Sequence, residues 1–359
     1  MSRQLPSSHR DETTRGSTVA GETPRERVVD DEKTVGRAVA DEESRDGAAR
    51  SVSVVVPSYN HARFVERTLR SVFAQTHAPS ELLVIDDGSA DDSPRVVERV
   101  LRDCPFPCAL IARANRGLCA TLNEGLSRSR GEFFAYLGSD DLWLADFLGA
   151  RLALLEARPH DVLAFGHAYL IDERDRVVDC TKDWASYADG DARAMLLGTV
   201  APMSPTVVYR RDALARHGWD EAARLEDYDL YLRLSVDGEF AFDPRVLAAW
   251  RRHGANASAD QRMMLEEQLA AQRRVLPSFG MTPGEIERLH ARISFARAED
   301  FMRVGAKREA LGLIRRNLGG VTSARNLARM ALRLLVPHRL MLRRARGRAA
   351  ERYGSMELQ

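Results

Sequence analysis

Two carboxylates stand next to each other in the stretch YLGSDD (136–141). Asp140 and Asp141 follow the segment GEFFAYL, whose apolar, strand-forming residues predict a buried strand. Two adjacent like charges raise the pKa of one of them and cost stability unless something positive lies nearby. The pair is therefore either a solvated turn or a site that faces a cation.

A second acidic pair, Glu226 and Asp227, opens the segment LEDYDLYLRL (225–234), whose amphipathic pattern predicts a helix. A carboxylate within hydrogen-bond reach of a hydroxyl is a sufficient general base. Acidic residues also suit helix N-termini simply because they oppose the helix dipole. Taken alone, this pair is compatible with both roles.

The elements that must position these residues alternate between strands and helices. Strands joined through helices predict a mostly parallel sheet with both faces covered. Apolar runs predict strands at 51–56, 81–89, 108–115 and 132–141, and helical patterns lie at 61–75, 91–103 and 117–129.

Polar residues follow each of the four predicted strands. In open sheets of this kind, ligands bind at the carboxyl ends of the strands. The convergence of these residues on one edge therefore predicts the functional site. The residues are Ser58, Tyr59 and Asn60, then Asp86 and Asp87, then Asn115 and Arg116, and finally Asp140 and Asp141.

The composition suits a globular protein. The formal net charge of the 359 residues is +1 and 44% of them are hydrophobic, whereas a nucleic-acid-binding protein would carry a strong basic excess. No apolar run is long enough to predict a transmembrane helix, and no secretory signal is visible at the N-terminus. The four scattered cysteines predict reduced thiols in a cytoplasmic protein, since no second pair completes a zinc site.

The chain divides into three parts by composition. Residues 1–50 are rich in charged and small polar residues, so we expect them to be disordered. Residues 51–258 carry the alternating pattern and form the predicted catalytic domain. Residues 259–359 are predicted to be helical, with breaks at 277–285 and at Pro337.

Four motifs carry a resemblance to a known family. They are VVVPSYNH (54–61), VIDDGSADDS (84–93), NRGLCATLNEGLSRSRGEFFAYLGSDD (115–141) and LEDYDLYLRL (225–234). In this order and at these intervals, they resemble a family 2 glycosyltransferase of the GT-A fold over roughly residues 51–255. The resemblance implies a mostly parallel sheet flanked by helices, here with a helical C-terminal extension. It also implies transfer of a sugar from a nucleotide diphosphate to an acceptor with inversion.

The resemblance implies a divalent metal, Mn²⁺ or Mg²⁺. Such a cation takes oxygen ligands and stabilises the growing charge of the leaving diphosphate. YLGSDD matches the D-x-D position of the family, with Asp140 as the expected direct ligand. Gly138 stands where the first aspartate often lies, which leaves Asp141 as either a metal ligand or a supporting residue.

The resemblance also assigns residues to the donor nucleotide. Tyr59 is suited to stack on the base, a contact that contributes ~1–3 kcal/mol in other base-stacking sites. Asp86 or Asp87 accepts a hydrogen bond from a uracil-like N–H, and we favour Asp86. Arg116 is a further diphosphate contact. The predicted nucleotide-binding set is Pro57, Ser58, Tyr59, Asp86, Asp87, Arg116 and Ser139.

On the acceptor side, the resemblance gives Asp227 the role of general base and Glu226 a supporting or acceptor contact. AWRRHGANAS (249–258) matches a segment that closes over the diphosphate in this family. It implies that His253 binds the metal or a phosphate and that Arg251 binds the diphosphate. APMSPT (201–206) is expected to line the acceptor side because it precedes the base helix.

The segment 324–353 holds nine arginines and one glutamate, interleaved with apolar residues at helical spacing. Basic amphipathic helices commonly lie on anionic membranes. A helix packed on the catalytic domain with a solvated arginine face is the alternative. A lipid-linked acceptor would fit membrane docking, so we expect a cytoplasmic protein that is peripheral on the inner face of the membrane.

The prediction is therefore an inverting glycosyltransferase of the hexosyltransferase type in cell-surface polysaccharide or glycoconjugate biosynthesis. The donor is a nucleotide-sugar, most simply a UDP-sugar, and the acceptor a saccharide or lipid-linked molecule. The alternative is a non-catalytic nucleotide-sugar-binding relative, although Asp140 and Asp227 are both present. Nucleotidyltransferases and NAD-dependent enzymes carry glycine-rich loops after the first strand, and PSYNH (57–61) is no such loop.

Overall fold

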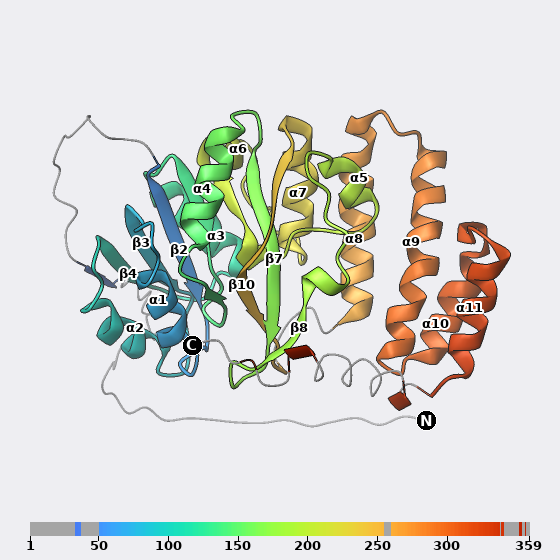
Figure 1. Cartoon of the computed structure of the whole chain (residues 1–359), viewed down its shortest axis with the longest axis horizontal. Helices are drawn as coiled ribbons and strands as arrows, with labels where there is room; N and C mark the ends of the chain where they lie inside the picture. Colours follow the sequence, from blue (N-terminus) through green and yellow to red (C-terminus); the bar gives the residue numbers. More distant parts are fainter. Residues whose placement is uncertain are drawn as a thin grey trace, which may run out of the picture. The chain divides into compact units, whose positions relative to one another are not determined.

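A computed structural model describes residues 33–36, 50–254, 260–337, 339–340, 352–353 and 356 (Figure 1). Glu32–Gln359 belong to one compact unit, whereas Met1–Asp31 lie outside the described residues. The centre of the described part is a ten-stranded mixed sheet with strand order β1-β4-β3-β2-β5-β9-β7-β10-β6, and β8 pairs with β7 off this path. The strands are β1 Lys33–Gly36, β2 Val52–Ser58, β3 Glu81–Asp86, β4 Cys108–Ala112, β5 Phe133–Tyr136, β6 Leu142–Trp143, β7 Leu163–Ile171, β8 Val177–Cys180, β9 Val208–Arg210 and β10 Phe240–Arg251.

The four strands predicted from the apolar runs form the parallel half of this sheet. β2 pairs in parallel with both β3 and β5, and β3 pairs in parallel with β4. Every residue of β2 is buried, as expected for a strand covered on both faces. β9 then runs antiparallel to β5 and to β7, and β10 is parallel to β7. The predicted carboxyl edge is therefore real for β2, β3, β4 and β5.

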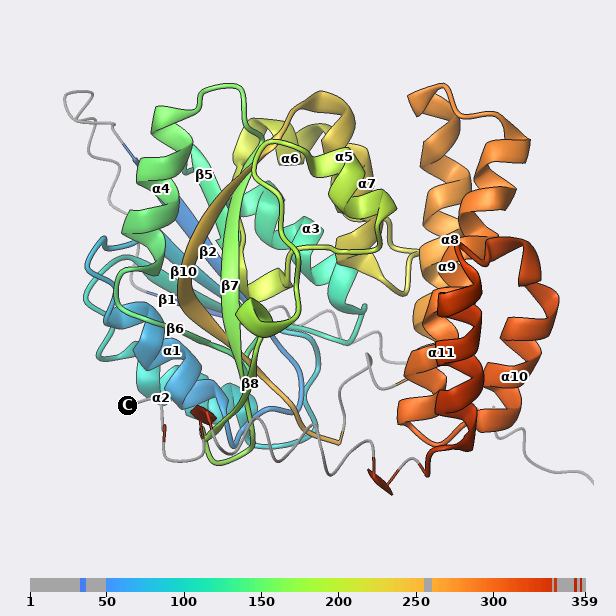
Figure 2. The same ribbon diagram turned by 45° about the vertical axis from the view of Figure 1, so that its right-hand side comes forward.

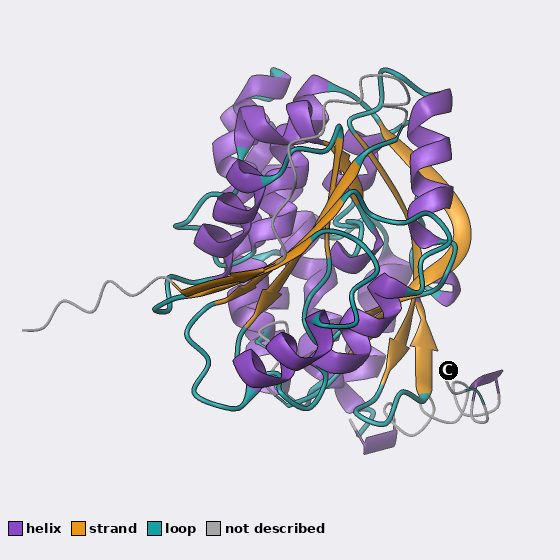
Figure 3. Cartoon of the chain, turned by 90° about the vertical axis from the view of Figure 1, so that its left-hand side faces the viewer, coloured by secondary structure: helices purple, strands orange, loops and turns teal. Residues whose placement is uncertain are grey.

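Helices cover both faces of the sheet (Figures 2 and 3). One apolar core joins the sheet to α1, α2 and α4. The other core joins the opposite face to α3, α5, α6 and α7 and continues into the C-terminal helices. The bounds are α1 Val65–Phe73, α2 Ser93–Leu101, α3 Leu118–Arg128, α4 Phe147–Ala157, α5 Ala192–Leu197, α6 Arg211–His217 and α7 Glu226–Asp237.

Local sequence explains where these helices begin. α2 starts with Ser93 and has Pro94 in its first turn, where the missing N–H of proline leaves no bond unmade. Gly117 precedes α3 with φ of 89°, a conformation that residues with a Cβ rarely adopt. The predicted helices at 61–75, 91–103 and 117–129 are thus confirmed, with shorter bounds.

The C-terminal part consists of helices, as predicted (Figure 2). The break expected at 277–285 lies between α8 and α9, where Thr282 and Glu285 form a reciprocal capping box. Further breaks follow α9 at Val304 and α10 at Asn317, and the sequence pattern did not indicate them. The helices are α8 Gln261–Val275, α9 Pro283–Arg303, α10 Lys307–Arg316 and α11 Ala324–Leu335.

One expectation about the N-terminal fifty residues is wrong for four of them. Lys33–Gly36 form β1, which pairs antiparallel with β4 at the edge of the sheet. An exposed strand edge offers unpaired main-chain groups to any segment, so a polar stretch can add a strand without an apolar core. The rest of the predicted disordered segment, 1–32 and 37–49, lies outside the described residues.

Among the described residues, no helix is long and apolar enough to cross a membrane.

Candidate functional site

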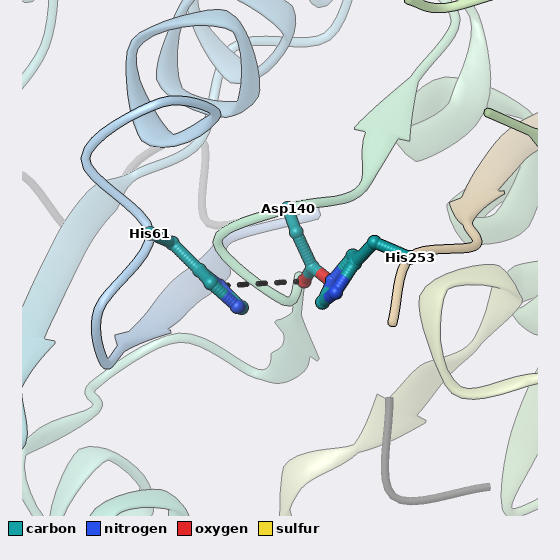
Figure 4. A group of neighbouring side chains, drawn as sticks. All are labelled: His61, Asp140 and His253. Carbon is teal, nitrogen blue, oxygen red and sulfur yellow. Dashed lines mark hydrogen bonds and ion pairs between the residues drawn. The ribbon is translucent and has the colours of Figure 1, made fainter. Parts of the chain in front are cut away.

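Three loops that follow β2, β5 and β10 bring two histidines to one aspartate (Figure 4). Nε2 of His253 lies 2.8 Å from Oδ2 of Asp140, and Nδ1 of His61 lies 3.7 Å from Oδ1. One ligand atom from each of the three residues lies within 4.8 Å of the others. The imidazoles stand on either side of the carboxylate, with ring centroids 5.5 Å apart. Two nitrogen ligands and one oxygen ligand are a donor set that suits a divalent metal ion.

The loop that carries Asp140 is fixed by Arg251, the last residue of β10. The Arg251 side chain is 2% exposed, and its Nε donates to the carbonyl oxygen of Asp140 at 2.6 Å. Its other nitrogens bond the carbonyl of Asp172 at 2.8 Å and pair with the carboxylate of Asp175 at 2.5 Å. The guanidinium also lies over the ring of Phe64, 4.8 Å from its centroid. The structure thus places Arg251 inside the protein, and its predicted contact with a diphosphate stays a prediction.

Asp141 points to the backbone rather than joining the two histidines. Its Oδ1 accepts a hydrogen bond from the main-chain N–H of Arg251 at 2.8 Å, and it is not part of the three-residue group. Burial raises the pKa of Asp141 well above its ordinary value, and the neighbouring charge of Asp140 adds to this. A cation beside Asp140 would relieve part of that repulsion.

Gly138 explains why the first aspartate of a D-x-D pattern is absent. A Cβ atom at this position would lie 3.0 Å from Oδ1 of Asp140 and 3.1 Å from Oδ2 of Asp141. A third carboxylate would therefore be pressed against two others. The structure supplies the histidines instead.

His61 is the site residue that sequence reasoning missed. Its Nδ1 lies 2.8 Å from Oγ of Ser139, so the predicted site residue Ser139 orients this ring. Burial lowers the pKa of the His61 imidazole, although the charge of Asp140 opposes this shift. This shift favours the neutral ring, which is the form that binds metals. The available signal was its place in PSYNH, directly after the polar end of the first parallel strand.

The ends of β2 and β3 lie side by side, as predicted for the nucleoside pocket. Pro57 and Ser58 pair with Ile85 and Asp86 in the parallel ladder. The buried carboxylate of Asp86 accepts hydrogen bonds from the hydroxyl of Ser58 at 3.2 Å and from the hydroxyl of Ser89 at 2.7 Å. Tyr59 is 50% exposed at the end of β2, so its ring is open to a ligand.

Asp87 has a different position from Asp86. Its carboxylate accepts hydrogen bonds from the main-chain N–H groups of Arg116 and Gly117, both at 2.8 Å, and forms an ion pair with Arg113. These contacts hold the turn that leads into α3. The exposed side chain of Arg116 lies 3.9 Å from Glu124. Asp87 thus holds the backbone of this turn, and Asp86 likewise accepts one main-chain N–H, from Ser89 at 2.9 Å.

Glu226 and Asp227 form the first turn of α7, as predicted. Both side chains are half-buried, and neither forms an ion pair with any residue that the structure describes. Burial, with the charge of Asp227, raises the pKa of Glu226 to about 8. Burial raises the pKa of Asp227 to about 6, although the N–H of Tyr228, which donates to its Oδ1 at 2.6 Å, opposes this. Burial thus raises the pKa of both carboxyl groups, and mutual repulsion makes the pair hold a proton more readily near neutral pH than an ordinary acidic pair does.

The next residues of α7 join this helix to α8. The hydroxyl of Tyr228 donates to the carbonyl of Leu196 at 2.9 Å and accepts from Nε2 of Gln272 at 2.8 Å. The carboxylate of Asp229 bonds Arg233 within α7 at 2.8 Å and Arg274 of α8 at 2.6 Å. The C-terminal helices therefore contact the helix that presents the acidic pair.

The sequence is similar to known proteins over part of its length. Residues 53–218 match a family model described as Glycosyl transferase family 2. An uncharacterized glycosyltransferase of Nostoc sp. is 30% identical over 170 residues, which are 46% of this chain and 52% of that protein. An uncharacterized glycosyltransferase of Rickettsia prowazekii is 24% identical over 225 residues, 60% of this chain and 68% of that protein. The chain thus spans about half the length of the Nostoc relative.

Two solved structures share the fold. The mannosyltransferase PcManGT from Pyrobaculum calidifontis, in complex with GDP-Man and Mn²⁺, superposes with a TM-score of 0.56 and 19% identity, covering 85% of this chain and 87% of that one. TarS 1–349 of S. aureus, in complex with UDP-GlcNAc, superposes with a TM-score of 0.52 and 16% identity, covering 84% and 89%. At such identities the likeness shows the fold, and the predicted GT-A fold is confirmed.

Proposed function

We propose that this protein, whose residues 53–218 match the model of glycosyltransferase family 2, transfers a sugar from a nucleotide diphosphate donor to a saccharide or lipid-linked acceptor with inversion. The observation that carries the proposal is the contrast between two acidic centres. Asp140 lies between two imidazoles, whereas Asp227 has no cationic partner among the described residues. One centre suits a cation and the other suits a proton.

The first centre fits a divalent metal because one ligand atom from each of three residues lies within 4.8 Å of the others. Asp140 and His253 would hold the ion, as the sequence predicted. Asp141 and Arg251 would hold the loop that carries Asp140 in position through their hydrogen bonds. When bound, such an ion stabilises negative charge on the oxygens of a leaving diphosphate.

For the donor, the end of β2 offers an exposed aromatic ring, and the adjacent end of β3 offers a carboxylate. Tyr59 would stack on the base, and Asp86 would accept its N–H, with Ser58 orienting that carboxylate. Two proteins of the same fold bind GDP-Man and UDP-GlcNAc, which supports a nucleotide-sugar as the donor class. We retain a UDP-sugar as the specific donor and a hexose as the transferred group.

The second centre would accept the proton of the acceptor. In a single displacement, the acceptor oxygen forms a bond to the anomeric carbon while the bond from that carbon to the diphosphate oxygen breaks. The hydroxyl proton passes to the carboxylate of Asp227, and the nucleoside diphosphate leaves. A pKa of about 6 keeps Asp227 charged at neutral pH yet basic enough to act. Glu226, with a pKa of about 8, would stay protonated and can donate a hydrogen bond to the acceptor.

The acceptor proposal includes a membrane surface at α11. Leu332 follows Arg329 by three residues and Arg325 by seven, so these three exposed side chains lie on one side of the helix, and Leu335 follows Leu332 by three residues. Leu332 is 63% exposed and Leu335 79%, whereas only Met330 of this helix is buried. Exposed leucines beside two arginines fit the surface of an anionic bilayer. We therefore propose peripheral attachment at the cytoplasmic face, in the assembly of cell-surface polysaccharide or glycoconjugate.

The test is a panel of nucleotide-sugars, measured for metal-dependent binding and for turnover, with the wild type, Asp140→Ala and Asp227→Asn. We expect one donor to bind with the metal, Asp140→Ala to lose that binding, and Asp227→Asn to bind without turnover. A wild type that binds a donor but neither hydrolyses nor transfers it would be the non-catalytic relative. A wild type that binds no donor with any metal would refute the proposal.

A further inference from the structure

His61 occupies a position that the proposed function does not require. It comes from the loop between β2 and α1, 79 residues before Asp140 and 192 before His253, counting along the chain. Its ring nevertheless faces the same carboxylate, and one of its nitrogens lies within 4.8 Å of the ligand atoms of both residues. The other two members were predicted from the sequence as metal ligands. The structure adds a third.

The backbone of the loop holds His61 in place. The main-chain N–H of His61 donates to Oγ of Ser93 at 2.9 Å, and the preceding residue Asn60 has a φ of 54°. Residues other than glycine rarely adopt this left-handed backbone conformation, and asparagine tolerates it better than most. Asn60 therefore suits the turn that presents His61. The ring then meets Phe64 edge-on, with centroids 6.1 Å apart, and bonds the hydroxyl of Ser139. The histidine therefore faces Asp140 before any ligand binds.

His253 is held as firmly from the other side. Its ring stacks on Phe64 with centroids 5.6 Å apart and an interplanar angle of 22°. Both imidazoles thus contact one phenyl ring, and both face one carboxylate. Packing against Phe64 therefore restricts the movement of both imidazole rings.

We propose that His61 is the third protein ligand of the metal, and that the two imidazoles make the site select Mn²⁺ and similar transition ions over Mg²⁺. Mg²⁺ prefers oxygen ligands in near-ideal octahedral geometry and gives up its waters reluctantly. Imidazole nitrogen suits transition metals, and two histidines with one carboxylate are a recurrent set for such ions. The proposal rests on the proposed function, since it assigns the metal of that same site.

The experiment uses the full chain with Mn²⁺ alone, followed by electron paramagnetic resonance. Couplings from the nitrogens of two imidazoles are expected in the wild type, and couplings from one in His61→Asn. Loss of a direct ligand should weaken Mn²⁺ binding by at least about tenfold, since even residues behind the ligands affect affinity by 10–100-fold. An excess of Mg²⁺ should displace Mn²⁺ from His61→Asn but not from the wild type. His160→Asn, at an exposed position, is the matched control and should behave as the wild type.

The experiment can disprove the role of His61 without disproving the metal site itself. If the wild type binds Mn²⁺ with a single imidazole coupling, and Asp140→Ala abolishes binding, then the metal site stands and His61 is not a ligand. If Mg²⁺ competes equally in the wild type, the selectivity is refuted. If the wild type binds no Mn²⁺, the metal of the proposed function falls as well. The coupling count in the wild type decides the question even if His61→Asn fails to fold.

Discussion

The main-chain N–H of Arg251 donates to Oδ1 of Asp141 at 2.8 Å. This bond ties the end of β10 to the loop after β5, one residue past Asp140 and two residues before His253. This hydrogen bond thus joins the two loops that present the predicted metal ligands, close to Asp140 and His253. A shift in either loop would move both ligands together.

Replacing Arg251 with methionine should lower the free energy of unfolding. Removal of one partner of a buried ion pair typically costs about 3–5 kcal/mol. The loss here should not exceed that range, because Asp175 keeps its second ion pair, with Arg67 at 2.9 Å. Urea unfolding measures this loss. Arg176→Met is the control, since its side chain is exposed and its pair with Asp172 should contribute less than about 1 kcal/mol. If Arg251→Met unfolds like the wild type and only loses donor affinity, Arg251 is the diphosphate ligand that the sequence predicted.

The acidic pair predicts how the reaction depends on pH. Asp227 must be charged to accept a proton, so kcat/KM should rise with pH through about 6. Asp227→Asn should lower kcat by about 10²–10⁴-fold with donor affinity unchanged. Glu226 is protonated in this range, so Glu226→Gln should leave the acidic limb where it is. An acidic limb that persists in Asp227→Asn would exclude this residue as the base.

The same shifts predict how stability depends on pH. Both carboxyl groups have folded pKa values above the unfolded values of about 4, so the folded state binds more protons between these values. The contribution of this pair to stability should therefore fall as pH rises from about 4 to about 8, and then level off. Asp227→Asn should remove the part of the fall below about pH 6, and Glu226→Gln the part that extends to about 8. Thermal unfolding across this range tests the sign; a slope unchanged in both variants would contradict it.

Tyr59→Ala should weaken binding of the nucleotide alone. Loss of base stacking costs about 1–3 kcal/mol, or roughly 5–150-fold in affinity. Because the side chain is half exposed, thermal stability should stay near that of the wild type. Calorimetric titration with UDP measures the effect, and Tyr59→Phe, which keeps the ring, should retain affinity. Equal losses in both variants would point to the hydroxyl instead of stacking.

Tyr228→Phe should reveal the link between α7 and α8. Without the hydroxyl, the carbonyl of Leu196 and the amide of Gln272 lose their common partner, at a cost of about 1–3 kcal/mol. Urea unfolding measures this cost. We also expect a lower kcat with little change in donor affinity, because the helix that presents the acidic pair is loosened. Tyr353→Phe, whose hydroxyl bonds the exposed side of Asp183, is the control.

Attachment of α11 to membranes should depend both on its exposed leucines and on the neighbouring arginines. Each cation near an anionic surface contributes about 1 kcal/mol, so the double variant Arg325→Gln, Arg329→Gln should bind anionic vesicles roughly 30-fold more weakly. Leu332→Ser should also weaken binding without lowering stability, because the side chain is exposed. Sedimentation with vesicles of anionic or zwitterionic lipid measures this.

Arginines elsewhere on the surface provide the control for that prediction. The double variant Arg95→Gln, Arg102→Gln makes the same change in charge at exposed positions of α2 and just after it. If it weakens vesicle binding equally, the attraction is one of overall charge. If the wild type sediments no more with anionic vesicles than with zwitterionic ones, the membrane proposal is wrong.

The parallel half of the fold was predictable because its strands are covered on both faces. Such strands must be apolar throughout, and β2 and β3 show this directly as the runs SVSVVV and ELLVI. β7 and β10 escaped prediction because they are interrupted by polar residues that the fold buries in pairs. Asp243 of β10, for example, is neutralised by the buried Arg151 of α4, 92 residues away.

The candidate site was predictable where one motif contained the chemistry, and less so where it depends on contacts between loops. Asp140 and Asp227 stand in recognisable patterns. His61 is a single histidine in a turn, and only the approach of three strand ends shows that it faces Asp140. Likewise, an arginine at the end of a strand is expected to reach solvent. Arg251 is buried instead because it contacts Asp172 and Asp175, which lie in a turn about 80 residues earlier in the chain, so its position could not be predicted from the local sequence.

Because the proposed ligand set contains one carboxylate and two neutral imidazoles, its charge of −1 offsets only half of a divalent ion's +2. A pair of carboxylates would cancel that charge completely. The site would keep a net charge of +1 and so would hold a nucleoside diphosphate more strongly after the sugar has left than before, since the free diphosphate is the more negative. We therefore expect release of the nucleoside diphosphate, and not transfer of the sugar, to be the rate-limiting step.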